Sequence, residues 1–195
     1  MDFLVATALD CLAARGVRVE RGLAPAEFER LERTFRFRFG PEQHRLLAAA
    51  MPISDGWVDW RDDDAAHEAL ERPIREIVAA VLHRGFWLPG WGRRPPGDLR
   101  AERATRHRLR EVPALVPLHA EHYLPGEPMP CGSPVFSLLR IGVVSHGETL
   151  LDHVEHHFGR QRRIGRPWRE VPSVPFWSDL ASRYVPSAPR STYGR

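Results

Sequence analysis

The sequence lacks the patterns by which many enzymes are recognised. It has no G-x-S-x-G segment around a nucleophilic serine, no Walker phosphate loop and no glycine pattern typical of dinucleotide binding. Cys131, Ser133 and Ser137 lie among prolines and apolar residues, which does not favour nucleophilic catalysis. We therefore predict a protein that is not an enzyme, has no catalytic residues and needs no cofactor.

Lysine is absent as well, so arginine supplies all 28 basic residues. We attribute this bias to GC-rich coding rather than to mechanism. The net charge is only +3, but residues 160–195 hold eight arginines against two acids, and "RAERATRHRLRE" (100–111) is also basic. Such segments can contact nucleic acid, acidic lipid or an acidic protein. Because no aromatic binding motif accompanies them, we expect a solvated face and a loose tail.

Long hydrophobic runs are also missing. No stretch approaches the roughly 18 uncharged apolar residues of a membrane-spanning helix, and the opening "MDFLVATALDCLAARG" carries acids where a signal peptide carries positive charge. We therefore expect a cytoplasmic protein without membrane contact. The two cysteines, Cys11 and Cys131, show no metal-ligand or redox spacing, so we predict buried thiols and no disulfide.

The apolar pattern changes along the chain. With 195 residues, 43% of them apolar, the chain is long enough to bury a substantial core. Apolar residues first recur at helical spacing, and beyond Pro113 they form short β-branched or aromatic runs. "FRFRF" (35–39) alternates as a strand does but is too short to predict one. Helices are expected over residues 1–15, in "LAPAEFERLERTF", from Pro41 to before Pro52, from Pro73 onward, in the charged segment before Pro113, and over 148–158.

These elements predict an α+β fold in which N-terminal helices pack on a twisted, mostly antiparallel sheet. The sheet is expected from "ALVPLHAEHYLP", "SPVFSLLR" and "IGVVSHG". A helix follows it, and then an irregular C-terminal tail whose end, "SAPRSTYGR", should fray. We divide the chain into an N-terminal helical extension (1–19), a central domain (20–160) and an Arg/Pro-rich C-terminal extension (161–195).

Four stretches follow one another in an order that resembles the SUKH superfamily, the domains related to fungal cell-wall-assembly regulators. They are "LAPAEFERLERTFRFRFGPEQHRLLAAAMPISDGWVDWRD", "GFWLPGWGRRP", "LVPLHAEHYLP" and "GSPVFSLL". The likeness covers the central domain, 20–160, and "FW…WG.RP" followed by "LVP" and "PVFS" is its most specific part. After "PVFS" many relatives carry an acid and paired tyrosines, whereas this chain has "LLRIGVVSHG".

The resemblance implies a helix-and-sheet domain that binds other proteins. Many bacterial members look like immunity proteins that neutralise a toxin delivered by neighbouring cells, and fungal members regulate wall synthesis through protein contacts. Our leading hypothesis is therefore a bacterial immunity protein that occludes its toxin sterically and electrostatically. One alternative is a module that binds nucleic acid or an acidic partner through the arginines of 100–110 and 160–169. Another is a metal-dependent enzyme that uses the histidines.

Four of the six tryptophans lie in two short, turn-like stretches. Trp87 and Trp91 flank a Pro-Gly turn, and we interpret them as structural wedges whose indole N–H groups bind loop carbonyls. The loop of residues 56–64 should be partly exposed, because its aspartates need solvent or a partner. Aromatic anchors and paired charges carry most interface energy. The predicted partner-binding residues are Trp57, Asp59, Trp60, Asp62, Asp63, His119, Glu121, His122 and Tyr123.

Histidines are the residues that most favour an enzyme. "HVEHH" (153–157) places three of them on one helical face. Zinc hydrolases combine such ligands with a glutamate base, but the H-E-x-x-H order is incomplete here and no cysteine joins the group. We therefore predict no metal site and a solvated helix surface. The residues that this alternative would use are His119, His122, His153, His156 and His157, with Glu121 or Glu155 as base.

Overall fold

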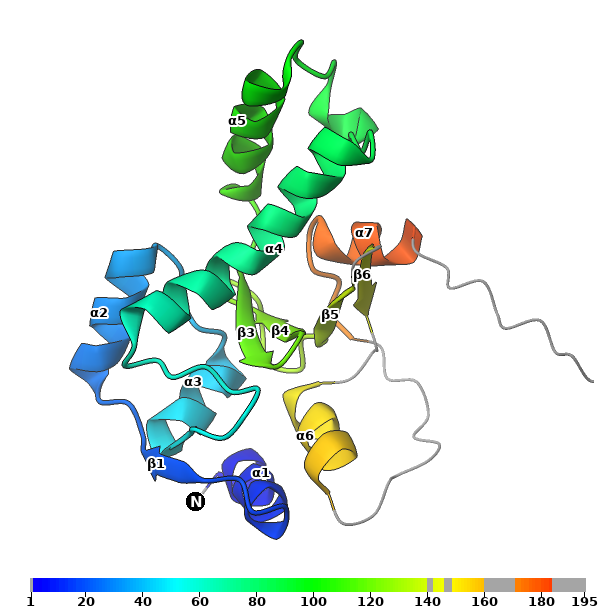
Figure 1. Cartoon of the computed structure of the whole chain (residues 1–195). Coiled ribbons are helices and arrows are strands. Elements are labelled where there is room, and N and C mark those ends of the chain that lie inside the picture. Colours follow the sequence, from blue (N-terminus) through cyan, green and yellow to red (C-terminus); the bar gives the residue numbers. More distant parts are fainter. Residues whose placement is uncertain (1, 140–141, 146–148, 160–170, 184–195) are drawn as a thin grey trace, which may run out of the picture.

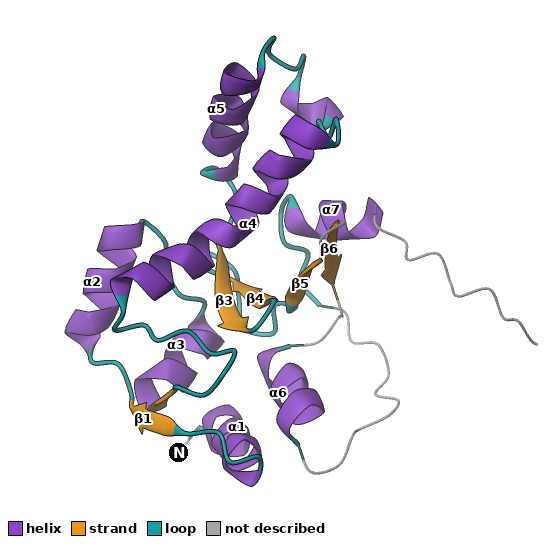
Figure 2. Ribbon diagram, in the orientation of Figure 1, coloured by secondary structure: helices purple, strands orange, loops and turns teal. Residues whose placement is uncertain are grey.

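Four antiparallel strands lie at the centre of the structure, and helices cover both faces of their sheet (Figures 1 and 2). This computed structural model describes residues 2–139, 142–145, 149–159 and 171–183. The predicted α+β class, with helices before and after an antiparallel sheet, is confirmed. The elements are α1 (Phe3–Ala14), β1 (Val19–Arg21), α2 (Pro25–Phe35), α3 (Pro41–Ala49), β2 (Ala50–Pro52), α4 (Asp63–His83), the short 3-10 helix η1 (Pro89–Trp91), α5 (Asp98–Leu109), β3 (Leu115–His119), β4 (His122–Pro125), β5 (Phe136–Leu139), β6 (Gly142–Ser145), α6 (Leu150–Phe158) and α7 (Trp177–Arg183).

The central sheet is a meander in the order β3-β4-β5-β6, and a separate pair is formed by β1 and β2. Val116 lies opposite Leu124 in the first hairpin of the meander. Successive residues of a strand face opposite sides of the sheet. Tyr123 accordingly joins the apolar cluster that contains residues of α4 and α7, whereas Leu124 joins the cluster that contains residues of α1 and α6. Both faces of the sheet are therefore buried, and for this reason the strands have apolar residues at consecutive positions.

Helix α1 packs into the core. Its Ala8 and Leu12 are fully buried and share one apolar cluster with Leu150 and Val154 of α6. The helix predicted over residues 1–15 is confirmed, as is the helix that ends before Gly159. The boundary that we placed at residue 19 stays a prediction, but burial of α1 ties it closely to the elements that follow.

In the segment "FRFRF", Phe35 is the last residue of α2, and residues 36–39 form a loop that places two phenylalanines in the core. Arg36 adopts a left-handed conformation with φ of 56° and ends α2. Phe37 and Phe39 are buried, and their ring centroids lie 6.0 and 4.8 Å from that of Trp60. The alternation in this segment therefore reflects the burial of aromatic rings.

Helix α4 begins at Asp63, not at Pro73 as predicted. The Asp62 carboxylate caps the helix by accepting hydrogen bonds from the amides of Asp64 and Ala65. Pro73 lies buried inside the helix, where it leaves one carbonyl without its helical partner because proline has no N–H. The prediction was wrong because the acids that open this helix resemble a solvated turn in the sequence.

The second half of α4 and α5 form a helical hairpin that projects away from the sheet (Figure 1), here called the arm. In the connection between these helices, the Trp87 indole donates to the Gly92 carbonyl over 2.7 Å. Trp91 stacks on Phe176, with nearly parallel rings 5.9 Å apart. Both tryptophans thus hold the connection in place, as the interpretation of structural wedges predicts.

The C-terminal extension contributes a short helix to the core. Trp177 of α7 is only 2% exposed, and its indole donates to the Pro113 carbonyl over 2.7 Å. Residues 184–195, including the predicted fraying end, lie outside the described residues. None of the helices in the described ranges is both long and apolar enough to cross a membrane.

The two cysteines are free thiols, and no disulfide joins them. Cys11 is half-buried. Cys131 is exposed in the connection between β4 and β5, so the prediction of a buried thiol is wrong at this position. Its Sγ accepts a hydrogen bond from Arg45 over 3.3 Å at the surface.

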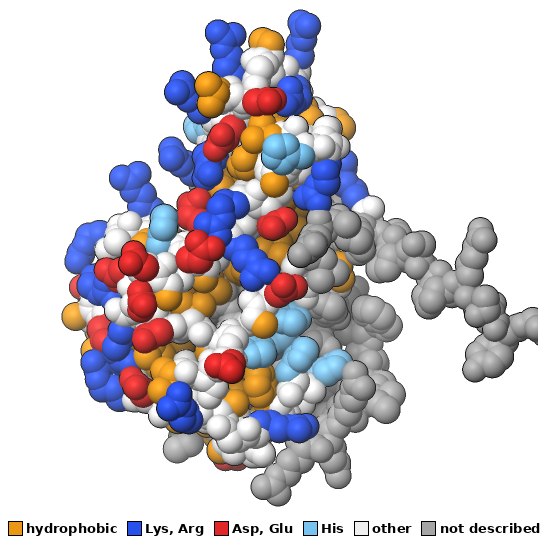
Figure 3. Space-filling view, viewed as in Figure 1, with side chains coloured by type: hydrophobic (Ala, Val, Ile, Leu, Met, Phe, Trp, Pro, Cys, Tyr) orange, Lys and Arg blue, Asp and Glu red, His pale blue; other side chains and the backbone are white. Residues whose placement is uncertain are grey.

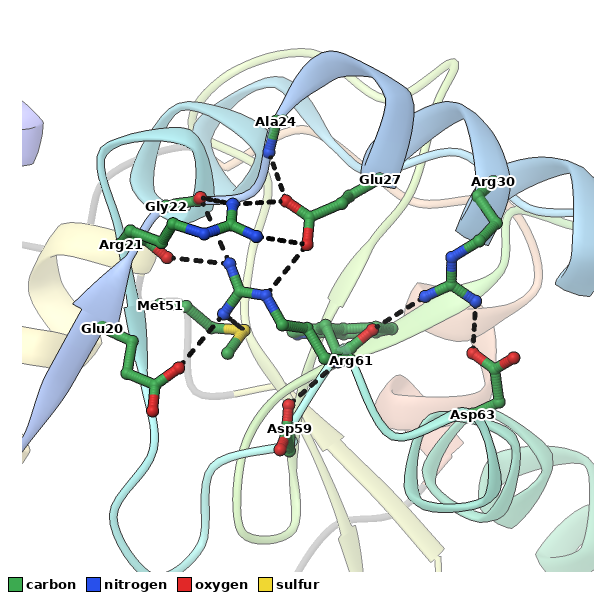
Figure 4. Close-up of polar contacts among 11 residues, drawn as sticks. Glu20, Arg21, Gly22, Ala24, Glu27, Arg30, Met51, Asp59, Arg61 and Asp63 are labelled. Carbon is green, nitrogen blue, oxygen red and sulfur yellow. Dashed lines mark hydrogen bonds and ion pairs between the residues drawn. The ribbon is translucent and has the colours of Figure 1, made fainter.

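Glu27 joins the start of α2 to two arginines (Figure 4). Its carboxylate accepts hydrogen bonds from Arg21 and from the Ala24 amide, both over 2.8 Å, and from Arg61 over 2.9 Å. The bond from Arg21, followed by those from Ala24 and Arg61, lowers the pKa of Glu27 to about 2. Because this pKa lies below that of the unfolded chain, the stabilisation is complete above about pH 5 and is lost as the pH falls toward 2.

Replacing Glu27→Gln should therefore lower the free energy of unfolding at pH 7 by roughly 1.5–3 kcal/mol, the range for hydrogen bonds to charged groups. The difference from the wild type should shrink between about pH 5 and pH 2, since the wild-type carboxylate becomes protonated there. Urea unfolding across this range measures the effect. Glu29→Gln, at an exposed position of the same helix, is the control. A difference that does not change with pH would contradict the role of the ionised carboxylate.

Candidate functional site

Several predicted contact residues of the 56–64 loop support the fold. Trp60 is only 2% exposed and lies among the phenylalanine rings of the core, so it cannot contact a partner. Asp62 caps α4, and Asp63 forms an ion pair with Arg30 of α2. The acidic residues of this loop are therefore largely engaged within the molecule, although their side chains remain exposed.

Arg61, which the sequence analysis did not single out, holds this loop to the rest of the molecule (Figure 4). Its amide donates to the Asp59 carboxylate over 2.9 Å. Its guanidinium donates to Glu27 over 2.9 Å and to the carbonyls of Arg21 and Gly22 over 3.0 and 3.3 Å. An arginine among aspartates gives no sequence signal for such partners, because they lie in β1, α2 and the turn between them.

Trp57 lies against the end of the central sheet. Its ring is half-buried, with centroids 5.1 Å from His119 and 5.7 Å from Phe158. The neighbouring Gly56 carbonyl accepts a hydrogen bond from the Ala120 amide over 2.6 Å. The structure thus brings together the 56–64 loop and the β3–β4 hairpin, the two segments on which the contact residues were predicted.

The four residues predicted beside the sheet lie on this hairpin. His119 ends β3 and pairs with His122 at the start of β4, next to an irregularity in register. Tyr123 is only 1% exposed, and burial raises the pKa of its hydroxyl. Glu121 is exposed and pairs with Arg72 of α4 over 2.8 Å. Tyr123 is therefore a core residue, whereas the other three side chains are at least partly accessible.

Histidines from the hairpin and from α6 converge at this end of the sheet, and Figure 3 shows histidine side chains gathered on this face. His153 is fully buried against the hairpin, so the prediction of a solvated surface is wrong at this position. Its ring centroid lies 4.5 Å from that of His122, 6.4 Å from that of His119 and 4.2 Å from that of His157. One nitrogen each from His119, His122 and His153 lies within 4.8 Å of the others.

Backbone groups orient two of these rings. Nδ1 of His122 lies 3.2 Å from the His119 carbonyl oxygen, so the neutral ring donates there and Nε2 keeps its lone pair. Desolvation, followed by the charge of His157, lowers the pKa of His119, while a hydrogen bond to the Asp55 backbone opposes this shift. Both causes favour the uncharged form of the His119 imidazole.

These histidines could hold a metal ion, because imidazole nitrogen suits zinc, copper and nickel. A hydrolytic site would also need a general base within reach of a bound water. Glu121, one of the two acids considered for that role, is engaged by Arg72. The arrangement therefore offers a set of metal ligands, whereas Glu121, held by Arg72, is poorly placed to act as a general base.

A second exposed feature is the outer face of α5. Leu99, Arg103, His107 and Arg110 follow at spacings of four, four and three residues, which aligns them on one side of the helix. Leu99 is 74% exposed. Arg100 lies beside this row, and Figure 3 shows basic side chains around the arm. We call Leu99, Arg100, Arg103 and Arg110 the α5 stripe. Within the described residues, none of its three guanidinium groups forms an ion pair or a hydrogen bond, in contrast to those of Arg106 and Arg108.

Comparisons with protein-family models, with curated proteins and with solved structures find no match. The similarity to the SUKH superfamily therefore rests on the sequence landmarks alone. The second arginine-rich segment considered above, residues 160–169, lies outside the described residues.

Gly56 provides a test of the contact between the 56–64 loop and the hairpin. Its φ is +85°, and a Cβ there would lie 2.7 Å from Nε2 of His119. Gly56→Ala should destabilise the fold by roughly 2–4 kcal/mol, since left-handed strain and overpacking add. Gly85→Ala, where φ is +67° and the space is open, should lose only roughly 1–2 kcal/mol. Guanidinium denaturation compares the two variants, and equal losses would show that the loop does not rest on His119.

Proposed function

We propose that this protein is a non-enzymatic protein-binding module whose α5 stripe binds an acidic surface of its partner. The observation that carries this proposal is a row of exposed guanidinium groups without carboxylate partners in the described part of the chain, on a helix that projects from the body. Arginine is enriched at protein interfaces because its planar, weakly hydrated head binds carboxylates in a bidentate manner. The arm presents these groups where a partner can reach them.

An acidic protein suits this surface better than nucleic acid does. Leu99, a large exposed apolar side chain, lies within the stripe, and such a residue gains more from a protein contact than from a phosphate backbone. Trp87 and Trp91 are engaged in the connection of the arm, so they do not form a platform for stacking bases.

The resemblance to the SUKH superfamily supports a more specific role, that of a cytoplasmic immunity protein. In this proposal the protein covers the active site of a toxin sterically, and the charge of the α5 stripe selects the partner. A basic nuclease toxin would need an acidic docking face, but Asp62 and Asp63 already serve a helix cap and an ion pair. We therefore propose a toxin whose contact surface is acidic.

Charge reversal on the stripe tests this proposal. The wild type and an Arg103→Glu/Arg110→Glu variant serve as baits in the producing bacterium, and the affinity for the captured protein is then measured with purified components. The double variant should bind at least about 30-fold more weakly, because each interface arginine contributes at least about 1 kcal/mol. The control is Arg33→Glu/Arg36→Glu, which makes the same change in charge at exposed positions near the end of α2.

The supporting result is an acidic protein that the wild type and the control variant both bind and that the stripe variant loses. Equal weakening by both double variants would indicate general attraction between opposite charges and would contradict a specific stripe. Retention of DNA in place of a protein, with a steep loss of affinity as salt rises, would favour the nucleic-acid alternative.

A further inference from the structure

The histidine cluster has the dimensions of a metal site. The ligand nitrogens of His119, His122 and His153 lie within 4.8 Å of one another. Nitrogens around a tetrahedral zinc ion lie about 3.4 Å apart, so the rings need to approach by at most about 1.4 Å. Rotation of the side chains about their bonds can supply a change of this size.

Two rings are held by the backbone in the way that metal-ligating histidines usually are. In such sites the second ring nitrogen binds a carbonyl or carboxylate, which fixes the tautomer and the ring orientation. His122 meets this condition, because its Nδ1 binds the His119 carbonyl and leaves Nε2 for a ligand. His119 meets it as well: its Nε2 side faces the backbone at Asp55 and Gly56, and its Nδ1 is buried without a partner in the described ranges.

Burial of an imidazole nitrogen that binds nothing is unfavourable, because the ring loses its hydrogen bonds to water. Apolar side chains could fill the same space without this loss. At His119 the surroundings are indeed apolar, with the Phe158 ring 4.9 Å and the Trp57 ring 5.1 Å away. A cation bound to Nδ1 would satisfy the nitrogen, and the apolar wall would shield the bond from water.

We infer that His119, His122 and His153 bind one divalent transition-metal ion of the zinc type, with His157 as its fourth ligand. His157 lies one helical turn after His153, on the same face of α6, and its ring is 5.0 Å from that of His122. Four nitrogen ligands fill a tetrahedral shell, so the site is structural and clamps α6 to the β3–β4 hairpin. Hard ions such as magnesium and calcium, which require oxygen ligands, are excluded.

Zinc titration of protein without an affinity tag tests this site, since a histidine tag would itself bind the ion. After removal of metal with EDTA and transfer into EDTA-free buffer, calorimetry should find one zinc ion per chain. The unfolding midpoint should rise by roughly 5–10 °C when free zinc reaches 100 times its Kd. The same concentration of magnesium should cause no shift.

Two variants distinguish a specific metal site from nonspecific zinc binding by surface histidines. His122→Gln changes a half-buried ligand and should bind zinc at least about tenfold more weakly, as expected for loss of a direct ligand. His83→Gln/His107→Gln changes two exposed histidines outside the cluster and should bind as the wild type does. Zinc bound below about one tenth of an equivalent, or equal binding by His122→Gln and wild type, would overturn the inference.

The fourth ligand has its own test at an exposed position where folding is not at risk. His157→Gln should keep one ion per chain but weaken its binding several-fold, and it should alter the visible spectrum of the cobalt-substituted protein. An unchanged affinity and spectrum would remove His157 from the ligand set. The cluster and the α5 stripe share no residues, so the outcome of these tests is independent of the binding experiment on the arm.

Discussion

The guanidinium of Arg61 fastens the 56–64 loop to the body, and the positions of several distant elements depend on that attachment. The side chain is held by the carboxylate of Glu27 and by carbonyls of the preceding turn. Such charge-assisted bonds are worth more than neutral ones, and breaking them would leave a half-buried charge unpaired. On one side of Arg61 the chain inserts Trp60 into the aromatic core, and on the other it supplies Asp62 as the cap of α4. At the start of the loop, Gly56 contacts the hairpin that carries two of the histidines.

The histidine cluster therefore depends on segments that are far apart in the sequence. The β3–β4 hairpin provides two rings, α6 provides two more, and Trp57, from the loop that Arg61 anchors, packs against His119. Helix α6 is itself set in place by burial of Leu150 and Val154 in the cluster that it shares with α1. Apolar packing thus brings the histidine pair of α6 to the histidine pair of the hairpin, and no local motif encodes the proximity of the two pairs.

Much of the fold could be predicted from periodicity. Helical spacing and helix-start signals identified α1, α2, α3 and α6, and a charged segment between a Pro-Gly turn and Pro113 identified α5. Short apolar runs between prolines identified the central sheet, because burial imposes this pattern directly. Prediction failed where one residue type serves two structures. Acids before Ala65 open a helix but resemble a turn, and Pro73 suits a first turn but lies within α4. In 35–39, alternation reflects aromatic burial without a strand.

The candidate sites could be predicted only in part, because they are products of tertiary structure. The sequence analysis assigned residues of the 56–64 loop and of the hairpin to one contact surface, but it could not reveal that Trp60 and Tyr123 are buried. It placed the histidines of α6 on one face without showing that this face meets the hairpin. The stripe on α5 was visible as a basic segment. The folded chain was needed to show that Arg106 of this segment is paired with Glu71.

Helix α4 connects the aromatic core to the arm, and this connection mechanically couples the two. Its first turns join the aromatic core through Ala66, and its later turns join the root of the arm through Ile77. The helix is 21 residues long and so spans about 30 Å as one rod. A torque applied at the tip of the arm would therefore be transmitted to the capped end of the helix, where the loop anchored by Arg61 begins. The arm and the body would then rotate together, and binding of a partner at the arm would also set the orientation of the histidine cluster relative to that partner.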